Sequence, residues 1–117
     1  MGRRSRRRSG DDIPAATSDY PDVQGNVLTL RDRLSSGTVE RVRELGSTPA
    51  ATADDRWQRR EELLFERLAV SWTIAALPLE GQAELLGRYR MADPDTRRWV
   101  REAVEGHLER NQPEVLA

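Results

Sequence analysis

Hydrophobic residues recur at helical spacing along the chain after residue 22. The first residues to do so, at intervals of four, three and four, are Val23, Val27, Leu30 and Leu34. This spacing places them on one helical face and predicts a short helix over about 27–35, with Asn26 as its cap. A second short helix is expected from Thr38 to Gly46. The segment 23–46 is therefore predicted to form two short amphipathic helices, followed by a linker over 47–52.

The stretch from Thr52 to Leu77 contains neither Gly nor Pro. Thr52, followed three residues later by Asp55, is typical of a helix start, because both side chains can bond the first free backbone N–H groups. The first half of this stretch is densely charged and the second half is almost wholly apolar. It predicts one long helix whose second half lies in the core, with Trp72 buried and Trp57 exposed.

Two further helices are expected in the C-terminal part of the chain. One covers about 79–91, and the other begins after Asp93, because Asp at the N-cap followed by Pro94 is a strong start signal. The helical domain then spans residues 53–112 and leaves a tail over 113–117. No strand pattern competes with the helical one, so the predicted fold class is all-α: a small bundle of about three core helices, preceded by the two short helices.

Residues 1–22 show no hydrophobic periodicity and are expected to form a disordered arm, basic over 1–10 and acidic over 11–22. The five basic residues of the arm are Arg3, Arg4, Arg6, Arg7 and Arg8. The other 107 residues hold 14 Arg against 20 Asp and Glu, a net charge of −6. We expect the arginines to act as an electrostatic tether, and nucleic acid is one possible target. An acidic body is atypical of a general nucleic-acid binder.

The amino-acid composition further limits the kinds of site and the classes of protein that the chain can represent. The chain has no Cys, which excludes disulfides, thiolate metal sites and cysteine nucleophiles. A small domain without disulfides or a structural metal ion has a low free energy of unfolding. Additional stabilisation by a protein partner or by homo-oligomerisation is therefore expected. The most apolar stretch, residues 68–79, is too short to span a bilayer, and no signal peptide is evident. These features predict a cytoplasmic protein that does not contact a membrane.

The polar residues give no catalytic signature. His107, the only histidine, lies at the margin of an apolar stripe and is expected to be a packing residue. Glu61, Glu62 and Glu66 alternate with arginines along one helix, which indicates a salt-bridged, solvent-exposed face rather than an acid–base pair. We therefore predict that the protein is not an enzyme and has no cofactor or metal ion.

Tryptophan and arginine residues are the best candidates for a binding surface. Tryptophan is enriched at interface hot spots, and a guanidinium can stack on an aromatic ring. The candidate partner-binding residues are Trp57, Trp99, Arg97, Arg98 and Arg101. The function predicted from the sequence is that of a non-catalytic interaction protein, an adaptor, regulator or accessory subunit. The alternatives are a nucleic-acid-associated protein that uses the arm, and an accessory subunit of a multi-chain enzyme.

Overall fold

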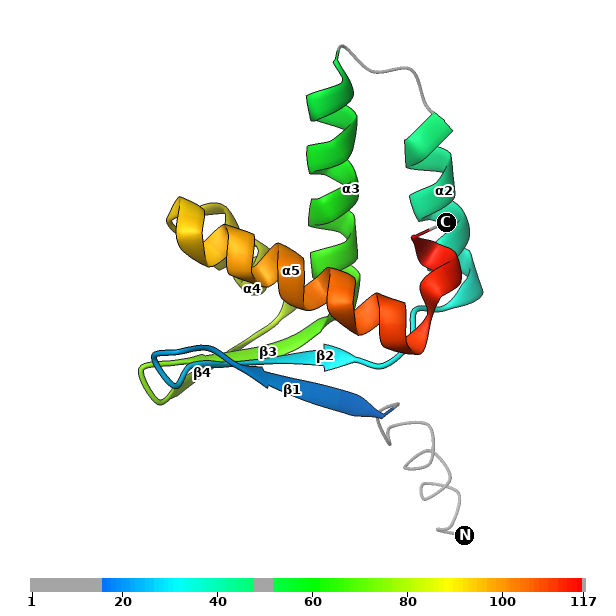
Figure 1. The fold of residues 1–117 in the computed structure, drawn as a ribbon. Coiled ribbons are helices and arrows are strands. Elements are labelled where there is room, and N and C mark those ends of the chain that lie inside the picture. Colours follow the sequence, from blue (N-terminus) through cyan, green and yellow to red (C-terminus); the bar gives the residue numbers. More distant parts are fainter. Residues whose placement is uncertain (1–15, 48–51, 117) are drawn as a thin grey trace, which may run out of the picture.

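The computed structural model describes residues 16–47 and 52–116 and shows an antiparallel sheet with helices on one of its faces (Figure 1). The strands, in the spatial order β1-β2-β3-β4, are β1 (Thr17–Pro21), β2 (Val27–Arg31), β3 (Ala69–Ile74) and β4 (Leu77–Glu80). All three neighbouring pairs are antiparallel. The register between β2 and β3 shifts at Thr29 and Leu30.

The helices form a layer over the sheet and a hairpin that projects from it. Their bounds are α2 (Ser36–Ser47), α3 (Ala53–Leu68), α4 (Gln82–Arg90), α5 (Pro94–Asn111) and a 3₁₀ turn, η1 (Pro113–Val115). In Figure 1, α4 and α5 lie over the sheet, whereas α2 and α3 stand side by side and rise away from it. α3 ends at Leu68, and β3 begins at the next residue, Ala69, without an intervening loop.

The core lies between the inner face of the sheet and the helices. β2 contributes Leu28 and Leu30, which are completely buried. The register partner of Leu28 on β3 is Trp72, which is 2% exposed, and that of Leu30 is Ala69. Phe65 of α3 packs edge-on against Trp72 and stacks on Tyr89 of α4 at 4.8 Å between ring centroids. This aromatic group joins α3, β3 and α4 into one hydrophobic core.

The prediction of an all-α helical bundle is wrong, and the first error lies in segment 23–34. Leu28 and Leu30 point into the core, while Val27 and Thr29 point to the other face. That alternation has the period of two that defines a strand, and only the wider spacing of the same hydrophobic residues resembled a helix. Of the two short helices predicted before residue 47, the structure has one, α2.

The second half of the predicted 52–77 helix is strand β3 and part of strand β4. Three of the six residues of β3 are β-branched, namely Val70, Thr73 and Ile74. Such side chains favour strands over helices. The turn between β3 and β4 consists of Ala75 and Ala76 with φ of 52° and 67°. Two-residue turns of this kind usually contain Asn-Gly, so the alanines gave no turn signal in the sequence.

The prediction of disorder over residues 1–22 is wrong for Thr17–Pro21, which form an edge strand. Ser18 donates a hydrogen bond to Asp32 at 2.6 Å, and Thr29 donates one to Asp19 at 2.7 Å. These local bonds add to the pairing with β2 in a segment that is mostly polar. Residues 1–15, which include the predicted arginine tether, lie outside the described residues.

Several local predictions are confirmed. Thr52 caps α3 by accepting a hydrogen bond from the Asp55 N–H at 3.0 Å, and Asp93 caps α5 by accepting one from the Thr96 N–H at 2.8 Å. Trp72 is buried, and Trp57 is 49% exposed. The predicted N-caps of α3 and α5 and the predicted exposure of these two tryptophans are therefore correct.

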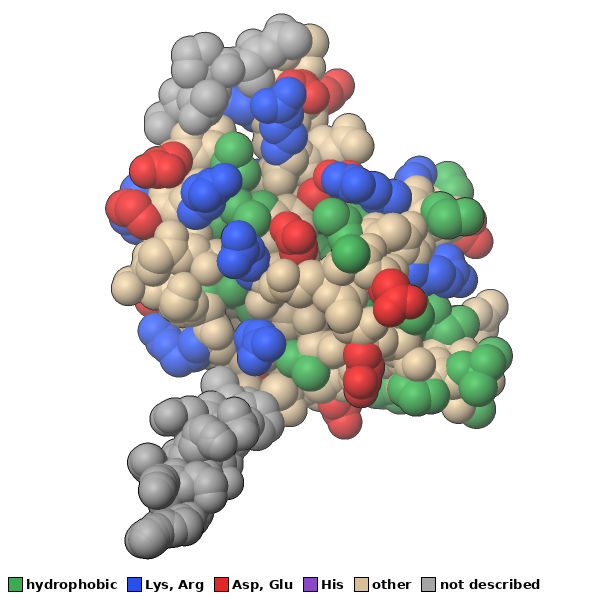
Figure 2. All heavy atoms as spheres, turned by 180° about the vertical axis from the view of Figure 1, so that it is seen from behind, with side chains coloured by type: hydrophobic (Ala, Val, Ile, Leu, Met, Phe, Trp, Pro, Cys, Tyr) green, Lys and Arg blue, Asp and Glu red, His purple; other side chains and the backbone are tan. Residues whose placement is uncertain are grey.

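The two turns at one end of the sheet are joined, and each has an exposed hydrophobic side chain in it or next to it. Val23, in the β1–β2 turn, is fully exposed, and Leu77, after the β3–β4 turn, is 72% exposed. The side-chain oxygen of Asn26 accepts a hydrogen bond from the Ala75 N–H at 3.0 Å and links the turns. Figure 2 shows the hydrophobic side chains gathered at this end of the sheet, whereas charged groups are spread over the helical part.

His107 ties α5 to the sheet, which corrects its assignment to the margin of an apolar stripe. Its side chain is completely buried. Nε2 lies 2.6 Å from the carbonyl oxygen of Arg31, and Nδ1 lies 2.5 Å from the hydroxyl of Tyr20. Because a carbonyl oxygen only accepts, Nε2 carries the proton and Nδ1 accepts from Tyr20. The imidazole thus connects α5 with both β1 and β2.

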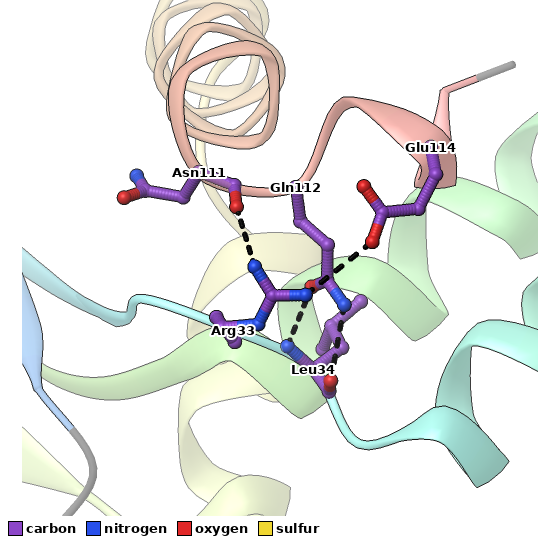
Figure 3. A network of polar contacts seen from close by, with 5 residues as sticks. All are labelled: Arg33, Leu34, Asn111, Gln112 and Glu114. Carbon is purple, nitrogen blue, oxygen red and sulfur yellow. Dashed lines mark hydrogen bonds and ion pairs between the residues drawn. The ribbon is translucent and has the colours of Figure 1, made fainter.

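Gln112 makes a second tie at the end of α5 (Figure 3). Its side-chain oxygen accepts from the Leu34 N–H at 2.8 Å, and its side-chain nitrogen donates to the Leu34 carbonyl at 3.2 Å. Arg33 adds an exposed ion pair with Glu114 at 3.4 Å. Val115 of η1 is also buried. The segment predicted as a tail over 113–117 is therefore packed into the fold as far as Val115.

We predict that Gln112→Ala lowers the free energy of unfolding by about 2–3 kcal/mol, because it leaves two buried backbone groups of Leu34 without partners. Arg33→Ala is the matched control in the same network. It removes an exposed ion pair with Glu114 and an exposed hydrogen bond to the Asn111 carbonyl at 2.9 Å, and it should cost less than about 1 kcal/mol. Urea unfolding followed by circular dichroism measures both. Equal losses for the two variants would contradict the structural role of Gln112.

Candidate functional site

A hollow of about 790 Å³ lies between α3 on one side and α4 and α5 on the other. We call it the α3–α5 trough. It is lined by Asp54, Trp57, Gln58, Glu61, Glu62, Tyr89, Arg90, Arg97 and Arg101. The α3 residues recur at intervals of one, three and four, so the helix presents one face to the trough. Beneath it, a much narrower slot of about 20 Å³ reaches apolar side chains of the core.

Trp57, Arg101 and Glu61 form the centre of the trough. The guanidinium carbon of Arg101 lies 5.3 Å from the ring centroid of Trp57, a cation–π distance. Arg101 Nε also lies 3.4 Å from Glu61 Oε2. Trp57 keeps about half of its surface exposed. A large aromatic side chain is thus held in place at the edge of a hollow and still faces solvent.

Glu61 is an unusual carboxyl group for a surface helix. Its side chain is only 14% exposed. Burial raises its pKa from 4.5 to about 7, and the nearby carboxylate of Glu105 also raises it, although the Arg101 guanidinium opposes the shift. The ion pair therefore does not offset the loss of hydration completely. A carboxyl group in this state exchanges its proton near neutral pH.

Glu62 lies on the same wall but in a different electrostatic environment. It accepts two hydrogen bonds from Arg90, at 2.8 and 3.2 Å. This pairing lowers the pKa of Glu62. Across the trough, burial raises the pKa of the Tyr89 hydroxyl, and the charge of Glu61 raises it further. Two adjacent glutamates therefore have pKa values that move in opposite directions.

The structure brings together three of the five candidate partner-binding residues. Trp57, Arg97 and Arg101 all line the trough. Trp99 is instead partly buried against the hydrophobic core. Arg98 forms an exposed ion pair with Asp95 on its own helix at 3.3 Å. Trp99 and Arg98 thus lie outside the trough lining.

Sequence reasoning missed the acidic residues of the site. Glu61 and Glu62 were expected on a solvent-exposed face, paired with arginines of the same helix. Their partners are instead Arg101 and Arg90, which lie on α5 and α4. A cross-helix pair separated by 28 or 40 positions leaves no local signal in one sequence. Because arginines lie next to these glutamates in the sequence of α3, ion pairs within one helix were predicted instead.

Within residues 16–47 and 52–116, no group of three or more His, Asp or Glu side chains is placed to hold a metal ion. None of the helices in this part of the chain is both long enough and apolar enough to cross a membrane. Comparison with protein-family models, with curated proteins and with solved structures gives no match for this chain.

The opposite pKa shifts of the two glutamates predict opposite pH dependences. Glu61 has a raised pKa, so its contribution to stability is greatest at low pH and is lost as the pH rises from about 4.5 to 7. Glu61→Gln should therefore become more stable than the parent protein over this range, by about 1–3 kcal/mol at pH 8, since one pKa unit corresponds to about 1.4 kcal/mol.

Glu62→Gln is the matched control for this prediction. Its carboxylate stabilises the fold above its normal pKa, so the variant should be less stable than the parent at neutral pH and match it only in acid. Urea unfolding between pH 4 and pH 8 measures both differences. A Glu61→Gln variant that loses stability relative to the parent as the pH rises would contradict the assigned environment.

Proposed function

We propose that the protein is a non-catalytic interaction module that binds a protein partner in the α3–α5 trough, with Trp57 as the anchoring residue. The observation that carries this proposal is the half-exposed indole of Trp57, fixed by Arg101 at the edge of a hollow of about 790 Å³. Tryptophan and arginine in such settings provide much of the binding energy of protein interfaces. The hollow also falls in the size range of binding sites.

The contacts made by His107, Arg90 and Arg101 support a binding role rather than a catalytic one. Both ring nitrogens of His107 contact groups within the fold, so this histidine is not presented to the trough. Arg90 and Arg101 are paired with Glu62 and Glu61, which holds both walls in a defined geometry before a partner arrives. A preformed site loses less conformational entropy on binding.

One observation favours a second candidate function, an accessory subunit that completes a partner's active site. A carboxyl group with a pKa near 7 beside a hollow is typical of general acid–base groups. In this alternative, Glu61 would exchange a proton with a substrate held by the partner. Glu61→Gln would then preserve partner binding but abolish the partner's activity.

The nucleic-acid alternative stays a prediction. The described residues carry 14 Arg against 18 Asp and Glu, and Arg98 and Arg101 are each paired with an acidic residue. These features weaken the case for a basic patch on the folded part of the chain. The arginines of residues 3–8 lie outside the described residues.

The test uses the full chain with a photo-crosslinking amino acid at Gln58, which lines the trough. We expect one protein adduct of constant mass from a lysate of the source cells, formed also after nuclease treatment. Trp57→Ala should weaken this capture at least 30-fold, the equivalent of about 2 kcal/mol, with little change in melting temperature. A chain with the crosslinker at Glu84, on the exposed side of α4, is the control. Equal capture from both positions, or capture of nucleic acid alone, would contradict the proposal.

A further inference from the structure

The two walls of the α3–α5 trough carry opposite charges. The acidic wall on α3 and the basic wall on α4 and α5 consist, respectively, of Asp54, Glu61 and Glu62 and of Arg90, Arg97 and Arg101. Two ion pairs bridge the walls. Asp54, however, makes no ion pair with another described residue, and neither does Arg97, whose guanidinium donates to the carbonyl of Arg90 at 3.4 Å. The trough therefore has an unpaired charge of each sign for an occupant that carries both.

The chain itself contains a segment with this charge pattern. Five arginines between residues 3 and 8 are followed closely by Asp11 and Asp12. The basic part is complementary to the acidic wall on α3, and the two aspartates are complementary to the basic wall. An arginine of this segment can also stack on the exposed surface of Trp57, as Arg101 already does.

The described chain begins close to the helix that forms one wall of the trough. The carbonyl of Ala16 accepts a hydrogen bond from the Asp32 N–H at 2.8 Å. The neighbouring residue, Arg31, is bonded to His107 of α5. Six residues of α5 separate His107 from Arg101, which corresponds to about 9 Å along the helix axis. The first strand therefore starts beside the C-terminal half of α5, and the N-terminal half of the same helix lines the trough.

The length of the preceding segment is sufficient to reach the trough. Arg8 and Arg3 lie 8 and 13 residues before Ala16, which corresponds to reaches of up to about 26 and 43 Å when the chain is extended. The exposed side of α5 carries the carboxylates of Glu102, Glu105 and Glu109. These acidic groups favour the passage of an arginine-rich segment over the helix.

We propose that residues 3–12 of the chain bind in the α3–α5 trough of the same molecule, with the arginines against the acidic wall and over Trp57. Attachment to the fold gives the segment an effective concentration in the millimolar range, so individually weak contacts suffice. A protein partner must then displace the segment to reach Trp57. That regulatory consequence rests on the function proposed above, whereas the intramolecular contact does not.

The absence of Cys from the sequence allows a direct test on the full chain. Ser9→Cys provides a single attachment site for a nitroxide spin label, and the ¹⁵N-labelled protein reports proximity through paramagnetic broadening. We expect the Trp57 indole N–H signal to lose more than half of its intensity relative to the sample with the reduced label. The signal should recover in 1 M NaCl, where the screening length is about 3 Å.

Two charge reversals separate this contact from others. Asp54→Arg changes the unpaired acid of the trough and should restore the Trp57 signal. Glu84→Arg makes the same charge change on the exposed side of α4, outside the trough lining, and should leave the broadening in place. Equal effects of the two variants would overturn the proposal, as would broadening along Glu102–Glu109 that does not reach Trp57.

A mixed sample identifies the molecule to which the segment belongs. Unlabelled protein that carries the nitroxide is combined with ¹⁵N-labelled protein that lacks the cysteine. Unchanged Trp57 intensity supports the intramolecular contact, and broadening in this sample would overturn it in favour of a second copy. Partner capture at Gln58 without broadening in the spin-labelled chain would sustain the proposed function and refute this inference.

Discussion

The position of α5 depends on buried polar contacts with segments far away in the sequence. His107 bonds the carbonyl of Arg31, 76 positions earlier, and Gln112 bonds Leu34, 78 positions earlier. Each contact satisfies backbone groups that would otherwise be buried without partners, a state that costs about 1–3 kcal/mol per group. Hydrophobic packing alone would tolerate a sliding helix, whereas these directional bonds fix α5 along its axis over β1 and β2.

Fixing the C-terminal half of α5 also places its N-terminal half. Arg97 and Arg101 lie on the same rigid helix, about two to four turns before the residues that hold it to the sheet. α3 is held opposite them by Phe65, which packs against both Trp72 and Tyr89. The trough is therefore a consequence of how two helices are anchored. Burial of Glu61 in one wall raises its pKa, and carboxyl groups with raised pKa values are common in binding and catalytic sites.

Local features of the sequence are sufficient for the starts of α3 and α5 but not for the sheet. Thr52 and Asp93 act on N–H groups two or three residues away, so their capping role can be read from a few neighbouring residues. Strands β1 and β3 lack such signals, because β1 is polar and β3 follows α3 without a break. The β3–β4 turn consists of two alanines, so no typical turn residue marks the second hairpin in the sequence. Within the trough, Trp57, Arg97 and Arg101 were recognised by residue type, whereas Glu61 was misread because its partner lies on another helix.

Residue-resolved hydrogen exchange of the full chain and of Gln112→Ala most directly tests whether the end of α5 sets the geometry of the trough. The account predicts that amide protection falls near Leu34 and also along α5 as far as Arg97, with a change in the exchange of the Trp57 indole N–H. Loss of protection confined to the surroundings of Leu34 and Gln112, with Arg97, Arg101 and Trp57 unchanged, would contradict it.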